Sequence, residues 1–287
     1  MPWAGWMCAR PGGMKCEDNG LDRLKVLSAR VLAALMLFML LTPAAMAEEA
    51  KMDGFYDLKP LIGEREGETA VLLLDRTYYS GETIYKGTTG RPLNGSCALH
   101  CGAVLISNLR GEIVTGQQVA KANNRDIKDA RRWTPFVSWG KVASAFGVSV
   151  QTENLAQYGN NLKNKGIGAE ERRVRKMEHI TEVFRTRSAD GGLMIHFNSS
   201  GRLNGSGTHR HAVVMVGYIE RDGQITDLLI NDSSVPAPEG VCIRMSESSL
   251  PVSIIGQRRL DKVKAEGGDI AMLLMDYAVS CRWVYAN

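Results

Sequence analysis

Two apolar runs lie close together in this chain: residues 212–219, AVVMVGYI, and residues 225–230, ITDLLI. Both runs are apolar and rich in β-branched side chains, which is typical of buried strands. Asp222-Gly223 lies between them and is a strong signal for a two-residue hairpin turn. The first run is apolar at nearly every position, so we expect a strand that is covered on both faces. This part of the chain therefore predicts a buried antiparallel hairpin.

The hairpin brings two polar residues near each other. His211 precedes the first run and Asp232 follows the second. With Asp222 and Gly223 as the loop, Val213 pairs with Asp232, and the alternation of side chains puts His211 on the same face. Diagonal neighbours of this kind have Cβ atoms about 7–8 Å apart, within reach of a His–Asp hydrogen bond. A bulge in either strand would break this parity.

Upstream of the hairpin, residues 97–109 (CALHCGAVLISNL) form an apolar run whose spacing predicts a helix that begins at Cys97. Further helices are predicted at residues 115–122, 137–146 and 170–187, and further strands at residues 70–74 and 193–197. Because most helices come first and an antiparallel sheet follows, the predicted class is α+β.

A cysteine at the start of a helix, together with a His–Asp couple, suits nucleophilic catalysis. The helix N-terminus and a nearby imidazolium favour the thiolate, and the imidazole supplies a proton to the leaving group. The carboxylate fixes the tautomer and orientation of the imidazole. We therefore expect Cys97 as nucleophile, His211 as general base and then acid, and Asp232 as orienting group. We expect no metal or cofactor, since no Cys-x-x-Cys or His-Glu-x-x-His spacing occurs.

These segments resemble a known family. Residues 97–109 are similar to the nucleophile helix of papain-like cysteine peptidases, in particular the bacteriocin-processing (double-glycine-leader) peptidases. Residues 211–218 (HAVVMVGY) resemble that family's histidine strand, and residues 229–233 (LINDS) its Asp-bearing strand. The order Cys, His, Asp is the family's order. Over roughly residues 90–250, the resemblance implies a papain-like fold and hydrolysis of a peptide or protein substrate through an acyl-enzyme.

The sequence departs from that family near the nucleophile. The family carries a Gln upstream of its cysteine that helps to hold the oxyanion, whereas residues 48–96 contain no Gln. Asn94 is the candidate replacement, beside the backbone N–H of Cys97. The family also has a Gly directly after its cysteine, and here Cys101 is the one followed by Gly. Cys101 is therefore an alternative nucleophile, although a helix that starts at Cys97 has the more usual length.

The N-terminus predicts export. Basic residues precede the apolar run 31–41, and Ala45-Met46-Ala47 follows it, as in a secretory signal peptide. The run is shorter than the roughly 20 residues that span a bilayer, so we expect cleavage after Ala47, no membrane span in the product, and a periplasmic or secreted location. The predicted signal peptide is residues 1–47. Residues 1–20 are unusual for such a peptide and suggest that the reading frame starts too far upstream. Residues 48–90 are either a pro-segment or part of the fold, and 91–287 form the predicted catalytic domain.

The composition excludes several classes of protein. The 287 residues are 44% hydrophobic and 23% charged, which is ordinary for a globular protein and unlike a disordered or coiled-coil chain. The net charge of +4 is too balanced for a nucleic-acid binder. We expect the basic cluster at residues 172–176 to be a solvated helix face. The cysteines allow more than one disulfide pairing, Cys242 with Cys281 among them.

Two alternatives to a peptidase stay open. An amidase or transpeptidase would use the same three residues and pass the acyl group to a different acceptor. A non-catalytic papain-like protein would keep the fold as a binding surface, and the missing Gln is the feature that favours it.

Overall fold

The hairpin forms as its sequence predicts. Strands β7 (Arg210–Arg221) and β8 (Gln224–Asn231) pair antiparallel, and the turn between them uses positive φ angles at Asp222 (51°) and Gly223 (75°). Such turns match the right-handed twist of the strands they join. The computed structural model describes residues 51–52, 54–63, 65–81, 96–125, 137–187, 191–205, 207 and 209–287, all within one compact unit, Met46–Asn287.

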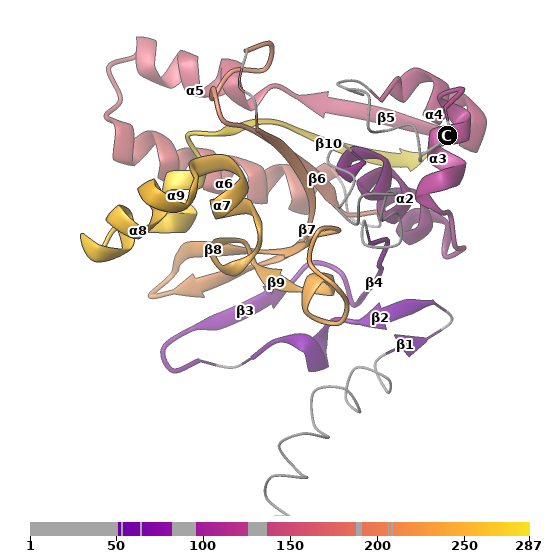
Figure 1. Cartoon of the computed structure of the whole chain (residues 1–287), viewed down its shortest axis with the longest axis horizontal. Coiled ribbons are helices and arrows are strands. Elements are labelled where there is room, and N and C mark those ends of the chain that lie inside the picture. Colours follow the sequence, from indigo (N-terminus) through magenta and orange to yellow (C-terminus); the bar gives the residue numbers. More distant parts are fainter. Residues whose placement is uncertain are drawn as a thin grey trace, which may run out of the picture. The chain divides into compact units, whose positions relative to one another are not determined.

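The hairpin lies inside a larger antiparallel sheet (Figure 1). Within the described ranges its strand order is β5-β10-β6-β7-β8-β9, and β3 pairs with the second half of β7. These strands are β3 (Thr69–Leu72), β5 (Val148–Glu153), β6 (Leu193–Asn198), β9 (Ile243–Arg244) and β10 (Ala278–Ala286). A smaller sheet consists of β1 (Lys51–Met52), β2 (Phe55–Asp57) and β4 (Arg76–Tyr78).

The helices follow in chain order. They are α2 (Cys97–Arg110), α3 (Gly116–Ala122), α4 (Trp139–Phe146), α5 (Leu155–Asn164), α6 (Ala169–Arg187), α7 (Leu250–Ile255), α8 (Gln257–Ala265) and α9 (Ile270–Leu274). The first three and α6 lie close to their predicted positions. The helices after β8 are ones that the sequence analysis did not predict.

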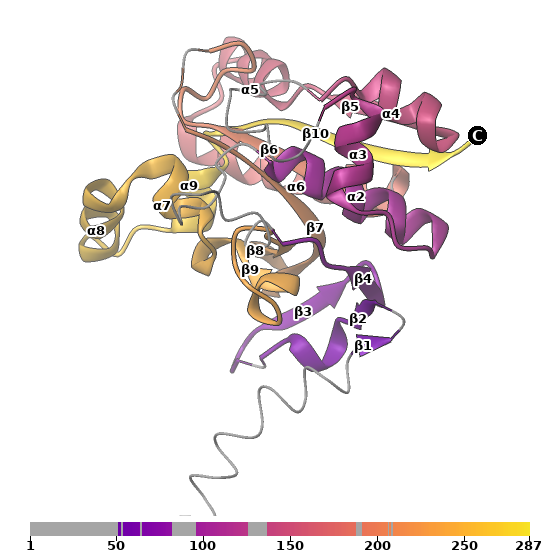
Figure 2. The same cartoon turned by 45° about the vertical axis from the view of Figure 1, so that its right-hand side comes forward.

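The sheet is covered on both faces, as the continuous apolar run of β7 predicts. Ala212 and Val214 belong to the apolar cluster that includes the residues of α2 facing the sheet. Val213 and Met215 point the other way and belong to the cluster that includes the apolar residues of α6. Figure 2 shows α2 and α6 on opposite sides of the strands. This sandwich fixes the start of α2 against the start of β7.

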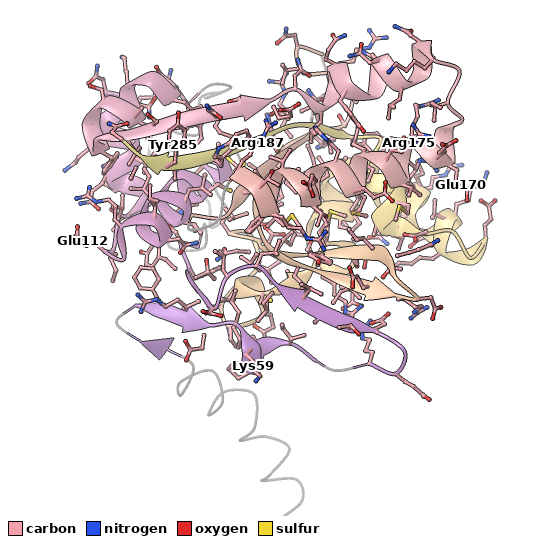
Figure 3. All side chains as sticks on the ribbon, turned by 180° about the vertical axis from the view of Figure 1, so that it is seen from behind. Lys59, Glu112, Glu170, Arg175, Arg187 and Tyr285 are labelled. Atoms are coloured by element: carbon pink, nitrogen blue, oxygen red, sulfur yellow. The ribbon has the colours of Figure 1, made fainter. Side chains whose placement is uncertain are left out.

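The basic cluster on α6 differs from the expected solvated face. Arg175 is exposed beside Glu171, and Figure 3 shows it on the outer side of the helix. Lys176, however, is buried and donates to the carbonyl oxygens of Met275 at 2.7 Å and Ala278 at 3.0 Å. Burial lowers the pKa of Lys176 to about 8. The prediction was wrong for this lysine, because α6 turns it toward the carbonyl groups after α9.

The structure is a mixed α and β protein with an antiparallel sheet, as the class prediction states. Helices and strands are less separated along the chain than expected, since β5 lies between helices, α7, α8 and α9 follow β9, and β10 ends the chain. Among the described residues, no helix is long and apolar enough to cross a membrane. The predicted signal peptide and Asn94 lie outside the described residues.

Candidate active site

Helix α2 begins at Cys97, the residue at which its apolar spacing predicts a start. It ends where Gly111 adopts a left-handed backbone conformation, with a φ of 66°. Ser96 occupies the position before the first turn, and Cys97 is only 8% exposed. Backbone N–H groups of a first helical turn have no acceptor within the helix, so this end is electropositive. The sulfur of Cys97 therefore lies at the electropositive end of α2.

Cys101 lies one turn further into α2 and is 2% exposed. It belongs to the apolar cluster between α2 and the sheet. The side chain of Cys97, by contrast, is among the groups that raise the pKa of His211. The alternative nucleophile is thus the more deeply buried of the two.

The register of the hairpin at the site is the one that the sequence predicts for Asp232. Val214 pairs with Asn231, as a two-residue turn requires for Val213 to lie opposite Asp232. Two bulges occur between the turn and the site, one with Val216 as the extra residue of β7 and one with Thr226 as the extra residue of β8. Because the extra residues lie on opposite strands, the two shifts cancel, and the spacing at the site is the same as in an unbroken hairpin.

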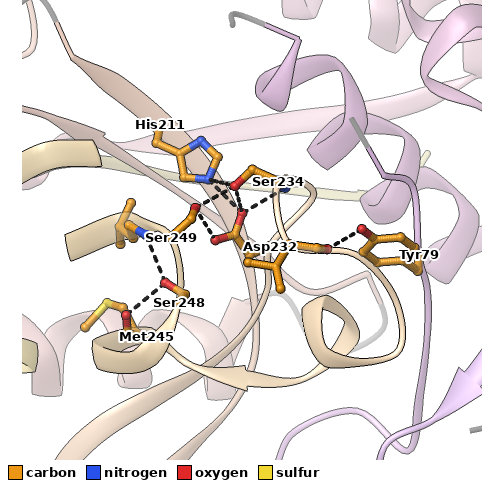
Figure 4. A network of polar contacts seen from close by, with 9 residues as sticks. Tyr79, His211, Asp232, Ser234, Met245, Ser248 and Ser249 are labelled. Carbon is orange, nitrogen blue, oxygen red and sulfur yellow. Dashed lines mark hydrogen bonds and ion pairs between the residues drawn. The ribbon is translucent and has the colours of Figure 1, made fainter. Parts of the chain in front are cut away.

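His211 and Asp232 are in contact, with 2.8 Å between Nε2 and Oδ1 (Figure 4). Asp232 is fully buried and His211 is 6% exposed. The side chain of Cys97 also interacts with the imidazole and raises its pKa. Since Nε2 donates to the carboxylate, Nδ1 is the ring nitrogen left for the sulfur. The structure thus brings Cys97, His211 and Asp232 together in that order.

The charges of His211 and Asp232 stabilise each other. Burial alone would lower the pKa of His211, but the charge and hydrogen bond of Asp232 and the contact with Cys97 raise it well above its usual value. Burial alone would raise the pKa of Asp232, but His211 and the hydrogen bonds from Ser234 hold it far below its usual value. An imidazolium–carboxylate pair is therefore the state expected near neutral pH.

Two serines that the sequence analysis missed surround Asp232. Ser234 donates to Oδ1 with its backbone N–H at 3.1 Å and its hydroxyl at 2.7 Å. Ser249 donates to Oδ2 with its hydroxyl at 2.9 Å. Ser234 lies two residues after Asp232, a spacing that local Asx turns use and that could have pointed to it. Ser249 lies 17 residues away, and no local pattern indicates it.

The segment before residue 82, whose role the sequence leaves open, packs against this site. Asn108 on α2 accepts the backbone N–H of Tyr78 at 2.8 Å, and Asn231 donates to the carbonyl oxygen of Tyr78 at 2.9 Å. The phenol of Tyr79 donates to the carbonyl oxygen of Val235. These contacts connect the segment both to the helix of Cys97 and to the loop that follows Asp232.

The remaining cysteines do not form the disulfide that the sequence left possible. Cys242 and Cys281 are both free and buried, and burial raises the pKa of each thiol to about 12. In the part of the chain that the structure describes, no group of three or more His, Cys, Asp or Glu residues could hold a metal ion.

Comparison with known proteins adds little to this geometry. No family model and no curated protein matches the chain. Among solved structures, it is similar to the crystal structure of UfSP from C. elegans, with a TM-score of 0.37 and 12% sequence identity. The match covers 79% of this chain and 35% of the UfSP chain. A likeness this weak does not support a function for this chain, and the geometry of the site is the evidence that bears on function.

Proposed function

We propose that this chain is a cysteine peptidase of papain-like fold, which hydrolyses peptide bonds in a peptide or protein substrate. The observation that carries the proposal is the unbroken set of contacts from Cys97 through His211 to the buried carboxylate of Asp232. A nucleophile, a proton carrier and an orienting group are what acyl transfer by a thiol requires.

The reaction has two stages. The Cys97 thiolate attacks the substrate carbonyl carbon and forms a C–S bond, and the His211 imidazolium then protonates the leaving amine as the C–N bond breaks. A water molecule next gives its proton to the neutral imidazole and attacks the thioester carbon. The C–S bond breaks, the carboxylic acid leaves, and the thiolate–imidazolium pair is restored. Asp232 accepts from Nε2 throughout, which keeps Nδ1 directed at the reacting atoms.

The negative oxygen that develops on the substrate needs hydrogen-bond donors. The backbone N–H of Cys97, the first residue of α2, is one donor in this proposal. Asn94 is the second, in the role that a Gln has in the resembling family. An Asn94→Ala variant should therefore lose kcat and keep the fast alkylation of Cys97, since the thiolate does not depend on the amide.

Brief exposure to a limiting amount of iodoacetamide at neutral pH, followed by mass-spectrometric mapping, tests the proposal. Cys97 should be modified much faster than the other cysteines, and His211→Ala should slow its modification. Cys101→Ala is the matched control, since it removes a thiol from the same helix and should leave the labelling of Cys97 unchanged. Faster modification of Cys101 would move the nucleophile to that residue. No preference among the thiols would favour a non-catalytic binding protein.

The acceptor of the acyl group decides between hydrolysis and transfer. An amine in place of water turns the same thioester into a new amide, so an amidase or transpeptidase would use the same residues. Product analysis with and without an added amine separates these activities. We expect the free acid to stay the main product when a millimolar amine is present.

We also propose export to the periplasm or the medium, on the basis of the N-terminal sequence. The exported protein should begin at Glu48, which N-terminal sequencing would test. A membrane-bound product that starts within the first 30 residues would contradict this.

A further inference from the structure

Ser249 occupies the position before the first turn of α7, yet its side chain makes no capping hydrogen bond. Serine at this position ordinarily accepts a backbone N–H of the first turn. The neighbouring Ser248 has the local role instead, since it accepts the N–H of Leu250 at 3.1 Å and donates to the carbonyl oxygen of Met245 at 2.9 Å. The hydroxyl of Ser249 points to Asp232 (Figure 4). Capping of α7 therefore does not explain the direction in which the Ser249 hydroxyl points.

The two oxygens of Asp232 have different partners. Oδ1 accepts from Nε2 of His211 and from both the backbone N–H and the hydroxyl of Ser234. Oδ2 accepts from the hydroxyl of Ser249, and it has no other donor within the described part of the chain. Because the carboxylate is fully buried, Ser249 alone prevents Oδ2 from being an unsatisfied charged acceptor. It is also the contact that fixes the rotation of the carboxylate plane.

The hydroxyl groups of Ser234 and Ser249 make more contacts than they have protons. The hydroxyl oxygens of Ser234 and Ser249 lie 2.5 Å apart, and each also contacts the carboxylate. The three contacts share two hydroxyl protons, since an ionised carboxylate has none. If both protons point at Asp232, the contact between the two serine oxygens has no proton. Asp232 and the neighbouring serine oxygen therefore compete for one of these protons, and the negative charge makes the carboxylate the stronger acceptor.

We propose that Ser249 is a positioning residue of the active site, whose hydroxyl holds Oδ2 of Asp232 and so sets the direction and the strength of the contact between Oδ1 and His211. The role rests on the proposed function, because it acts on the proton carrier of that reaction. A donor on Oδ2 takes part of the negative charge that would otherwise act on the imidazolium. Ser249 thus limits how strongly His211 keeps its proton, which suits a group that must release the proton to a leaving amine.

Among the described residues, few other titratable groups act on the imidazole. Cys97 faces it from the start of α2, Asp232 from the end of β8, and His196 from β6. Burial, together with nearby positive charges, lowers the pKa of His196 to about 4, so this ring is neutral above pH 5. A change in the titration of His211 that follows a change at Ser249 is therefore passed on by Asp232, directly or through the Ser234 hydroxyl, which contacts Ser249 at 2.5 Å and Nε2 of His211 at 3.4 Å.

NMR titration of the His211 ring in Ser249→Ala tests the proposal without requiring turnover. The pKa of His211 should rise by about 0.5–1 unit, and the Nε2 proton should move downfield, because the carboxylate charge is shared with one donor fewer. In turnover assays, kcat should fall about 3- to 10-fold at neutral pH with KM unchanged. Ser248→Ala is the matched control, since it removes a neighbouring hydroxyl that caps α7 and does not touch Asp232.

The pair Ser249→Thr and Ser249→Val serves if the alanine variant is unstable, because the two side chains share a shape and differ in one hydroxyl. Threonine should keep the wild-type titration and valine should show the upward shift. An unchanged or lowered pKa in the variants without a hydroxyl would overturn the proposal, as would an equal shift in Ser248→Ala. If Cys97 of the wild type is not alkylated fast, the proposed function fails, whereas the titration still decides the coupling between Ser249 and His211.

Discussion

Asp232→Asn removes the charge of the orienting residue and keeps its shape. The amide oxygen can accept from Nε2 of His211 and from Ser234, as Oδ1 does now. The amide nitrogen takes the position of Oδ2 and donates to the hydroxyl of Ser249, which in turn donates to Ser234. All three contacts between these groups then have a proton. We therefore expect the variant to fold and to melt within a few degrees of the wild type.

The cost should fall on the imidazolium. A hydrogen bond to a charged group contributes about 1.5–3 kcal/mol, and one between neutral groups about 1 kcal/mol. The variant therefore stabilises the imidazolium by about 0.5–2 kcal/mol less, which corresponds to roughly a 2- to 30-fold loss in kcat/KM. His211→Ala removes the proton carrier itself and should cost roughly 10²–10⁴-fold, and Cys97→Ala should abolish turnover.

Steady-state hydrolysis of a peptide substrate, with thermal unfolding of each variant, measures this order. The fraction of Cys97 alkylated in a fixed short time gives a second readout that needs no substrate. Equal and complete loss in Asp232→Asn, His211→Ala and Cys97→Ala, all with intact folding, would refute the argument that Asp232 acts mainly by orienting and charge-stabilising the imidazole.

Two further predictions concern pH. Activity should decline as the pH rises through the raised pKa of His211, because the leaving amine needs the imidazolium. In Asp232→Asn the decline should start at lower pH. A pH–rate profile with the same basic limb in both proteins would contradict this. Asp227 is buried, and burial raises its pKa to about 6. The folded protein therefore binds its proton more tightly than the unfolded chain, and the free energy of unfolding should fall as the pH rises from about 4 to about 6. Asp227→Asn should remove this fall and stabilise the protein at pH 8 by on the order of 2 kcal/mol, as measured by urea unfolding. A variant that is less stable than the wild type at pH 8 would contradict this, and would show that hydrogen bonds and nearby charges offset the cost of burying the ionised carboxylate.

Local sequence determined the pieces that depend on local physics. The start of α2 at Cys97 follows from apolar residues at helical spacing, and the hairpin turn follows from Asp222-Gly223, which tolerate positive φ angles. The approach of His211 to Asp232 follows from the length of a two-residue turn and the period of a strand. That estimate reached the right register although two bulges intervene, because their shifts cancel.

Tertiary structure alone decided the groups that complete the site. Ser249 reaches Asp232 from the start of α7, 17 residues further along the chain, and β3 joins β7 from a segment that precedes α2. The burial of Lys176 likewise depends on how α6 packs beside α9. In each case a polar group meets a partner far along the chain, and such a pairing leaves no periodic pattern around either residue. Periodicity reports which side of an element faces the core, whereas the position of a single buried hydroxyl is set by the packing of every element around it.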